Sequence, residues 1–510
     1  MQALKLKAIA TAAAITVALI ITGCASTGKI APQDKISDAA TLDVGAAIRT
    51  ANNDAHWPDL DWWRTYNDPQ LNSWVEIANQ GSPTLAMAQA RVREALSIAG
   101  VARSAQSPQV NGELSIQREH WADNVFYGPG PLANQDTWNN VGTIGLSYRL
   151  DLWGKDKNSA ELALDVAHAS AADAQTAQLE LDSNIIRTYI GMSRDYALLD
   201  IAATTLDRQQ QLLALAKRRF AGGIGTQLDV SQAQTPLPEY ERQIDTIEES
   251  IALAKNQLAA LAGKGPGAGE SISRPTLALD APDGLPSSVP VELIGHRPDI
   301  VAARWMVTAQ ARGIDAAKAD FYPNIDLLAS IGGYAAMGPF FKFLKSPSGS
   351  WTGGPAMSLP IFDGGRIRSQ LGAQSAAYDE AVDQYNQTIV GALKDISDDV
   401  IRLRSLQRQQ DDAQRSVASA TKSFDLAKEG FRRGLTDYVN VLIAQSQLLQ
   451  AQQGLARIQA EQLEAHASLQ EALGGGLVVP SNGPKESSMA PAKHIGPIGA
   501  LSKLSKLPSE

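Results

Sequence analysis

The sequence is poor in the features that mark disulfide-bonded, nucleic-acid-binding and helical membrane proteins. It holds one cysteine in 510 residues, which excludes a disulfide framework, a cysteine-rich zinc site and a redox pair. Acidic residues outnumber basic ones by 54 to 45, whereas nucleic-acid binding needs a basic surface. Beyond the N-terminus no run of 18 apolar residues occurs, so no membrane-spanning helix is expected there.

Catalytic motifs are also missing. The sequence contains no H-E-x-x-H, G-x-S-x-G or Walker A pattern, and no two of its six histidines stand four residues apart. A glycine-rich stretch at 263–269 follows a helical segment and leads into proline-rich sequence, which favours a linker over a phosphate-binding loop. The sequence therefore predicts a protein that is not an enzyme and that has no cofactor or metal.

The N-terminus has the pattern of an exported, lipid-anchored protein. Lys5 and Lys7 precede a short uncharged apolar run over 8–21, as in a secretory signal peptide. Small residues then lead to Cys24, and this ending resembles the bacterial lipobox, in which the cysteine is lipidated and becomes the mature N-terminus. We expect 1–23 to be a lipoprotein signal peptide and Cys24 to carry a covalent lipid. An ordinary signal peptide with an incidental cysteine is the alternative.

The rest of the chain is two copies of one unit about 210 residues long. Three landmarks recur in the same order, which chance explains poorly. They are the equally long spans 83–108 and 298–323, the segments 153–155 and 364–366, and the turns that contain Phe220 and Phe431. The repeat predicts the following division: 24–81, lipid anchor and equatorial segment; 82–262, first repeat; 263–296, equatorial linker; 297–475, second repeat; 476–510, disordered tail.

Each repeat is expected to contain a helix, two strands and a long helical hairpin. Apolar and polar residues alternate over 108–120 and 138–151 in the first repeat, and over 323–334 and 350–361 in the second. Strands of about ten residues with one apolar face can cross a bilayer when tilted. A soluble antiparallel sheet with one wet face alternates in the same way. The alternation alone therefore leaves both interpretations open.

The segments after the strands favour the membrane interpretation. No proline occurs over 132–235 or 361–479, and a helix over 159–220 would be about 90 Å long. No compact domain buries such a rod, so it must pack against other long helices. Four strands per chain cannot close a barrel, and an open sheet edge does not occur in lipid. The predicted fold is a mixed α/β membrane protein in which several chains contribute strands.

Several motifs carry a resemblance to a known family. The segments 296–303 (HRPDIVAA), 319–323 (ADFYP) and 359–366 (LPIFDGGR) are similar to motifs of the TolC-like outer membrane factors, and the lipidated NodT-type branch is the best match. The resemblance spans roughly 57–475. It implies a homotrimer whose twelve-strand outer-membrane β-barrel, with four strands per chain, continues into a long periplasmic α-helical barrel.

The resemblance also implies a function. Such a channel passively conducts drugs or other small molecules from an inner-membrane pump, through a periplasmic adaptor protein, to the outside. It would be anchored in outer-membrane lipid and extend into the periplasm. The alternative is a lipid-anchored periplasmic coiled-coil scaffold without a pore.

The helical hairpin turns are the site that the resemblance implies. They are expected to dock the adaptor at Phe220, Gly223, Phe431 and Gly434. The gate is expected to be formed by Val439, Asn440, Ile443 and Asp229, although the family often places carboxylates at the positions of Asn440 and Ile443. Pro236 and Pro238 should kink or interrupt the helix after the first turn.

Overall fold

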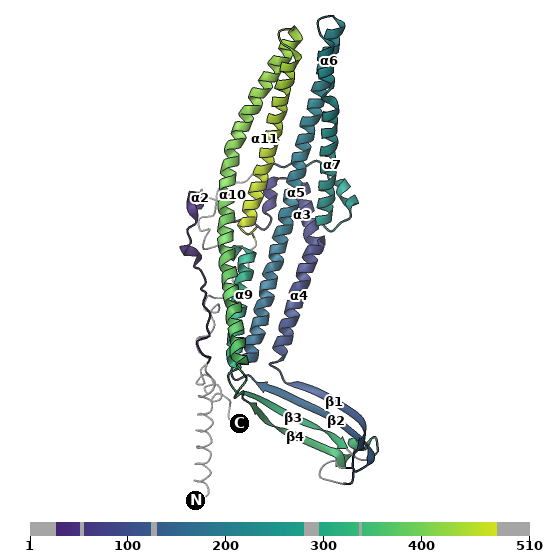
Figure 1. Ribbon diagram of the computed structural model, residues 1–510, viewed down its shortest axis with the longest axis vertical. Coiled ribbons are helices and arrows are strands. Elements are labelled where there is room, and N and C mark those ends of the chain that lie inside the picture. The colour runs from purple at the N-terminus through teal and green to yellow at the C-terminus, as the bar shows by residue number, and fades with distance from the viewer. Residues whose placement is uncertain (1–26, 51–55, 124–129, 280–294, 336–338, 477–510) are drawn as a thin grey trace.

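The computed structural model describes residues 27–50, 56–123, 130–279, 295–335 and 339–476. The expected signal peptide, Cys24 and all but the first residue of the expected tail lie outside these ranges. The described chain is elongated, with a bundle of long helices at one end and a sheet at the other (Figure 1). Among the described residues, no helix combines the length and hydropathy needed to cross a membrane.

The sheet takes two strands from each repeat. Its strands are β1 (Gln109–Trp121), β2 (Gln135–Leu150), β3 (Asn324–Ala335) and β4 (Gly349–Ser358), antiparallel in the order β1-β2-β3-β4. The fourth strand ends at Ser358 rather than at the expected residue 361, because its partner β3 begins at Asn324, the residue opposite Ser358. The outer strands β1 and β4 each have one edge without a partner within the described chain.

The register gathers large apolar side chains on one face of the sheet. Ile144 lies opposite Gly112 on one side and Ile331 on the other, and Ile331 lies opposite Trp351. These rows leave an exposed apolar face made of Val110, Leu114, Ile116, Ile144, Leu146, Leu327, Ile331, Trp351 and Met357. An exposed apolar face on a sheet of this length is typical of strands that cross a membrane.

The helices of the two repeats correspond in order and length. The first repeat has α4 (Pro83–Ser104), α5 (Lys155–Ala221), α6 (Gln227–Gln234) and α7 (Leu237–Leu261); the second has α9 (Pro298–Ala319), α10 (Arg366–Arg433) and α11 (Tyr438–Ala472). The helices α5 and α10 have 67 and 68 residues, each about 100 Å long. The expected interruption is confirmed, because α6 ends before Pro236 and a new helix begins after it.

Shorter elements surround the middle of the bundle. They are η1 (Ala39–Thr41), α2 (Gly45–Arg49), η2 (Trp62–Tyr66), α3 (Pro69–Gly81) and η3 (Pro266–Ser271), while η4 (Lys342–Leu344) and η5 (Ser346–Ser348) lie between β3 and β4. Trp62, Tyr66 and Trp74 are buried in one apolar cluster with residues of α5 and α7. The segment 27–50 follows α10 (Figure 1), and Asp379 accepts bonds from the backbone N–H groups of Gln33 and Asp34 at 3.0 and 3.1 Å.

Candidate functional site

The first hairpin tip joins α5 to α6 through a glycine turn. Gly223 has φ +73°, the left-handed conformation that glycine adopts without strain, and Ile224 N–H closes the turn on Arg219 O at 3.0 Å. Thr226 and Asp229 then form a capping box: the Asp229 carboxylate accepts Thr226 N–H at 2.9 Å, and Thr226 Oγ1 accepts Asp229 N–H at 3.2 Å. Asp229 therefore fixes the start of α6.

The second tip uses the same backbone chemistry between α10 and α11. Gly434 has φ +76°, and Leu435 N–H bonds to Gly430 O at 2.8 Å. One turn before it, Glu429 accepts bonds from Arg432 and Arg433 at 2.5 and 2.6 Å. These bonds lower the pKa of the Glu429 carboxyl to about 2, so the acid stays ionised. The last turn of α10 is thus held by a local ion network.

A set of side chains that sequence reasoning missed joins the two tips. The Arg219 guanidinium lies 4.9 Å from the centroid of the Phe431 ring and donates to Arg432 O at 3.3 Å. Phe431 packs edge-on against Tyr438, with ring centroids 5.4 Å apart. Gln209 Nε2 donates to the Tyr438 hydroxyl at 2.8 Å. The sequence gives one sign of these contacts. Arg219 lies next to the repeated turn, whereas the equivalent residue of the second repeat is Gly430.

The two phenylalanines of the repeated turns occupy different environments. Phe431 is 2% exposed within an apolar cluster contributed by α5, α6, α10 and α11, whereas Phe220 is 47% exposed. The cluster consists of Leu212, Ala216, Val230, Ala233, Phe424, Phe431, Tyr438, Val441, Ala444 and Leu448. Phe431 therefore stabilises the tip from inside, while Phe220 is available to a partner.

The expected gate residues fall on both hairpins. Val439 and Ile443 lie one turn apart on α11 and are 44% and 51% exposed, on the face opposite the buried Val441. Asn440 is also exposed, and its side chain donates to Thr436 Oγ1 at 2.8 Å. Asp229 belongs to the other hairpin. The structure thus places Val439 and Ile443 on the same face of α11. Asp229 and Asn440 each form hydrogen bonds within their own hairpin.

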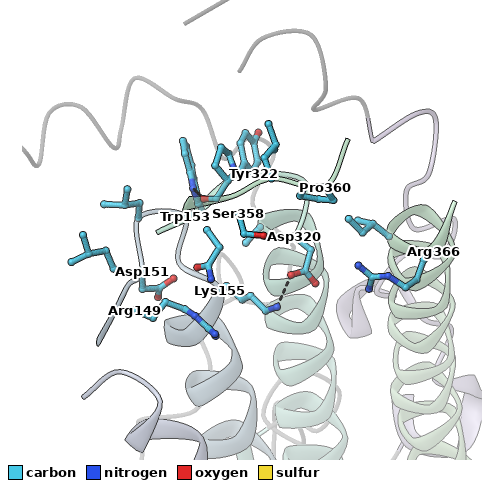
Figure 2. A pocket seen from close by; sticks show the side chains of 16 residues that line it. Arg149, Asp151, Trp153, Lys155, Asp320, Tyr322, Ser358, Pro360 and Arg366 are labelled. Atoms are coloured by element: carbon cyan, nitrogen blue, oxygen red, sulfur yellow. Dashed lines mark hydrogen bonds and ion pairs between the residues drawn. The ribbon is translucent and has the colours of Figure 1, made fainter. Parts of the chain in front are cut away.

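A cavity of about 270 Å³ lies where the strands meet the long helices (Figure 2). Lys155 at the start of α5 pairs with Asp320 at 2.5 Å, and Figure 2 marks this contact. Trp153 stacks on Tyr322 at 4.5 Å and donates to Pro323 O at 2.8 Å. The sequence motifs of both repeats therefore meet at this junction. Its paired charges and stacked rings are suited to fixing the sheet on the helices.

One acidic side chain is buried away from any cation at the middle of the bundle. Asp182 on α5 is 4% exposed, and its Oδ1 has no hydrogen-bond partner among the described residues. Burial raises the pKa of Asp182 to about 7, while a bond from Asn79 acts in the opposite direction. In the described ranges, no three His, Cys, Asp or Glu side chains form a group able to hold a metal ion.

Comparisons with known proteins agree with this architecture. The family model for the outer membrane efflux protein matches residues 74–264 and 289–475. The fusaric acid resistance protein FusA of Burkholderia cepacia is 62% identical over 364 residues, covering 71% of this chain and 69% of its own. The multidrug resistance outer membrane protein MdtP of Escherichia coli K12 is 27% identical over 464 residues, covering 90% and 94%.

Solved structures share the whole fold. The outer membrane protein VceC of Vibrio cholerae has a TM-score of 0.76 and 34% identity, covering 82% of this chain and 100% of its own. CusC, whose structures describe transmembrane channel formation, has a TM-score of 0.75 and 26% identity, covering 88% and 100%. The resemblance seen in the motifs is confirmed, and the channel is favoured over the poreless scaffold. The chain belongs to the outer membrane efflux protein family and is the non-enzymatic outer-membrane channel component of an efflux system.

Proposed function

We propose that three copies of this chain form a continuous duct that receives its cargo from an inner-membrane pump through a periplasmic adaptor. The observation that carries the proposal is the sheet, which within the described part of the chain has four strands and an edge without a partner at both β1 and β4. Unpaired edges are not tolerated in lipid, so each β1 must pair with β4 of a neighbouring copy. Three copies supply twelve strands, and the helices α5 and α10 prolong the duct into the periplasm.

We propose that the constriction of the duct lies at the hairpin tips. Three copies of Val439 and Ile443 would supply an apolar ring, because both side chains are exposed on α11 while their neighbour Val441 is buried. Asp229 and Asn440 would form the polar layer, with carboxylate and amide held by the local bonds to Thr226 and Thr436. An apolar ring resists water and ions until the helices move apart.

The outside of the same tips is the proposed adaptor surface. Gly223 and Gly434 set the turns, and Phe220, Ile224 and Leu228 supply exposed apolar side chains near the first turn. Phe431 supports this surface from within the cluster. Aromatic side chains that fill a partner's pocket contribute most of the binding energy in many interfaces.

The cargo is proposed to include a small lipophilic organic acid. This rests on the 62% identity to a fusaric acid resistance protein, and other relatives are named for multidrug, pyoverdine and toluene efflux. The test uses a strain that lacks its own copy of this channel but keeps the pump and adaptor. Expression of the chain should raise the tolerated fusaric acid concentration severalfold. Unchanged tolerance, with the protein present in the outer membrane, would contradict the proposed cargo.

Cys24 is proposed to be lipidated and to tether each copy to the outer membrane. The described segment 27–50 supports this, because it runs along α10 to a point near the strand junction, where the membrane begins (Figure 1). Each buried lipid CH₂ contributes about 0.8 kcal/mol to anchoring. Labelling with a palmitate analogue should mark the wild-type protein and leave Cys24→Ala unlabelled. Equal labelling of both would exclude lipidation at this residue.

A further inference from the structure

Residues 339–348, which precede β4, fold back over the apolar face of the sheet, at the end away from the helices. The Phe343 ring is buried against Gly142, where a Cβ would lie 2.8 Å from the ring. Gly333 allows an equally close approach, since a Cβ there would lie 1.8 Å from the Phe343 carbonyl oxygen. Gly142 and Gly333, in neighbouring strands, therefore leave the space into which this loop packs.

The loop is also fastened on its other side. Asn140, buried within the sheet, donates from Nδ2 to Phe340 O at 2.8 Å. The Phe340 ring packs edge-on against Trp138, with centroids 5.1 Å apart. Residues 339–348 are thus held in one place over β2 and β3.

A groove of about 670 Å³ lies between this loop and the sheet. Its walls are apolar on both sides, with Leu114, Ile144 and Ile331 on the sheet and Phe341 and Leu344 on the loop. All five side chains are exposed, so the groove opens onto the apolar face that lies against lipid in this family of channels. An elongated hydrocarbon chain is the ligand that matches such walls.

Positive charge surrounds the groove. Lys345 lines it, Lys342 is exposed in the same turn, and the Arg118 guanidinium lies over the Trp138 ring at 5.7 Å. Of the acids at this end of the sheet, Asp136 contacts His120 at 3.0 Å, Glu119 accepts a bond from Asn139, and Asp123 is exposed. The groove therefore combines an apolar trough with lysines at its rim, and neither Lys342 nor Lys345 forms an ion pair with another described residue.

We propose that this groove binds one phosphorylated glycolipid of the outer leaflet, with an acyl chain along the apolar walls and a phosphate between Lys342 and Lys345. The groove is centred on β2 and β3, while the edges that pair with neighbouring copies are β1 and β4, so the trimer leaves it open to lipid. A bound lipid would clamp the loop over the outer end of each four-stranded unit. A bilayer-facing phosphate at this depth is attracted by each nearby lysine.

The test is native mass spectrometry of the full-length protein in detergent micelles, with lipid A carrying both phosphates or the same lipid without them. The variant is Lys342→Gln with Lys345→Gln. The control removes two exposed lysines from the helical hairpins, as Lys217→Gln with Lys422→Gln. The mass of the assembly reports folding in every case.

The wild type and the control should bind the phosphorylated lipid, and the loop variant should bind it about twentyfivefold more weakly, which is about fivefold for each lysine. The lipid without phosphates should bind all three proteins equally and weakly. Unchanged binding of the phosphorylated lipid by the loop variant would overturn the proposal. Equal binding of the two lipids by the wild type would overturn it as well.

Discussion

The two hairpins of this chain have the same backbone plan and different side-chain chemistry. When the two repeats are aligned by Phe220 and Phe431, the helices α6 and α7 together correspond to α11. Yet the second hairpin buries its phenylalanine and continues as one helix, whereas the first exposes Phe220 and breaks at Pro236. The position equivalent to Pro236 is Gln447, inside α11. The repeat thus preserves helix length while the two tips differ in packing.

A second difference lies in the middle of the bundle. The position equivalent to the buried Asp182 is Leu393, which packs in the apolar cluster of α9 and α10. One repeat therefore carries an acid where the other carries a core leucine. These contrasts indicate that the second hairpin is packed more tightly than the first.

The largest expected effect comes from removing the buried phenylalanine. Phe431→Ala should destabilise the second tip by about 3–5 kcal/mol, because it leaves a cavity among tightly packed side chains. Phe220→Ala is the matched control and should cost less than about 1 kcal/mol. Hydrogen exchange of the amides of 424–448 measures the effect at the second tip, and exchange of the amides of 213–234 measures it at the first. Similar loss of protection in the two variants would show that the tips are packed alike.

The buried acid should make stability depend on pH. The folded pKa of Asp182 is raised from 3.8 to about 7, so its favourable contribution is full below pH 4 and is lost as pH rises through 7. Asp182→Asn should match the wild type near pH 4 and be more stable above pH 7, by about 2–4 kcal/mol. Thermal unfolding across this range is the measurement, with the exposed Glu180→Gln as control. A pH-independent difference would contradict this assignment.

Coupling between the tips should depend on Arg219. Arg219→Ala removes the ring contact with Phe431 and the bond to Arg432 O, which together contribute about 1 kcal/mol. Amide exchange should therefore rise at both tips. Lys217→Ala, two residues earlier, should change neither. If only the first tip responded to the loss of Arg219, the contact would not join the hairpins.

The smallest effect is expected from the prolines. Pro236→Ala with Pro238→Ala restores a backbone N–H at both positions and should join α6 to α7, as in the equivalent part of α11. Amides of 235–240 should become more slowly exchanging, with a change in stability of about 1 kcal/mol or less. Amides that remain fast in the double variant would mean that the break has another cause.

Local chemistry made the backbone of this fold predictable. The sequence assigns Gly223 and Gly434 to the turns and Pro236 to the break, because each residue acts through its own backbone angles. The strands were visible because alternation of apolar residues depends on neighbours along the chain. Fold and function from the motif resemblance were confirmed, whereas the gate residues remain predictions.

Contacts between distant segments could not be predicted. The bond from Arg219 to Arg432 O joins residues 213 apart, and the burial of Phe431 depends on four helices. Both turns have a phenylalanine followed three residues later by a glycine, so the sequence does not say which phenylalanine is covered. The seat of Phe343 on Gly142 and Gly333 likewise appears only when β2 and β3 are paired.

The most direct test of a duct constricted by the second hairpin is single-channel conductance of the purified protein in planar bilayers. Ile443→Ala should give larger or longer openings than the wild type, because it trims the exposed apolar ring. Gln232→Ala, at the equivalent position of the first hairpin, should conduct like the wild type. Identical conductance in all three proteins would contradict the gate, and well-folded protein without any conductance would contradict the duct itself.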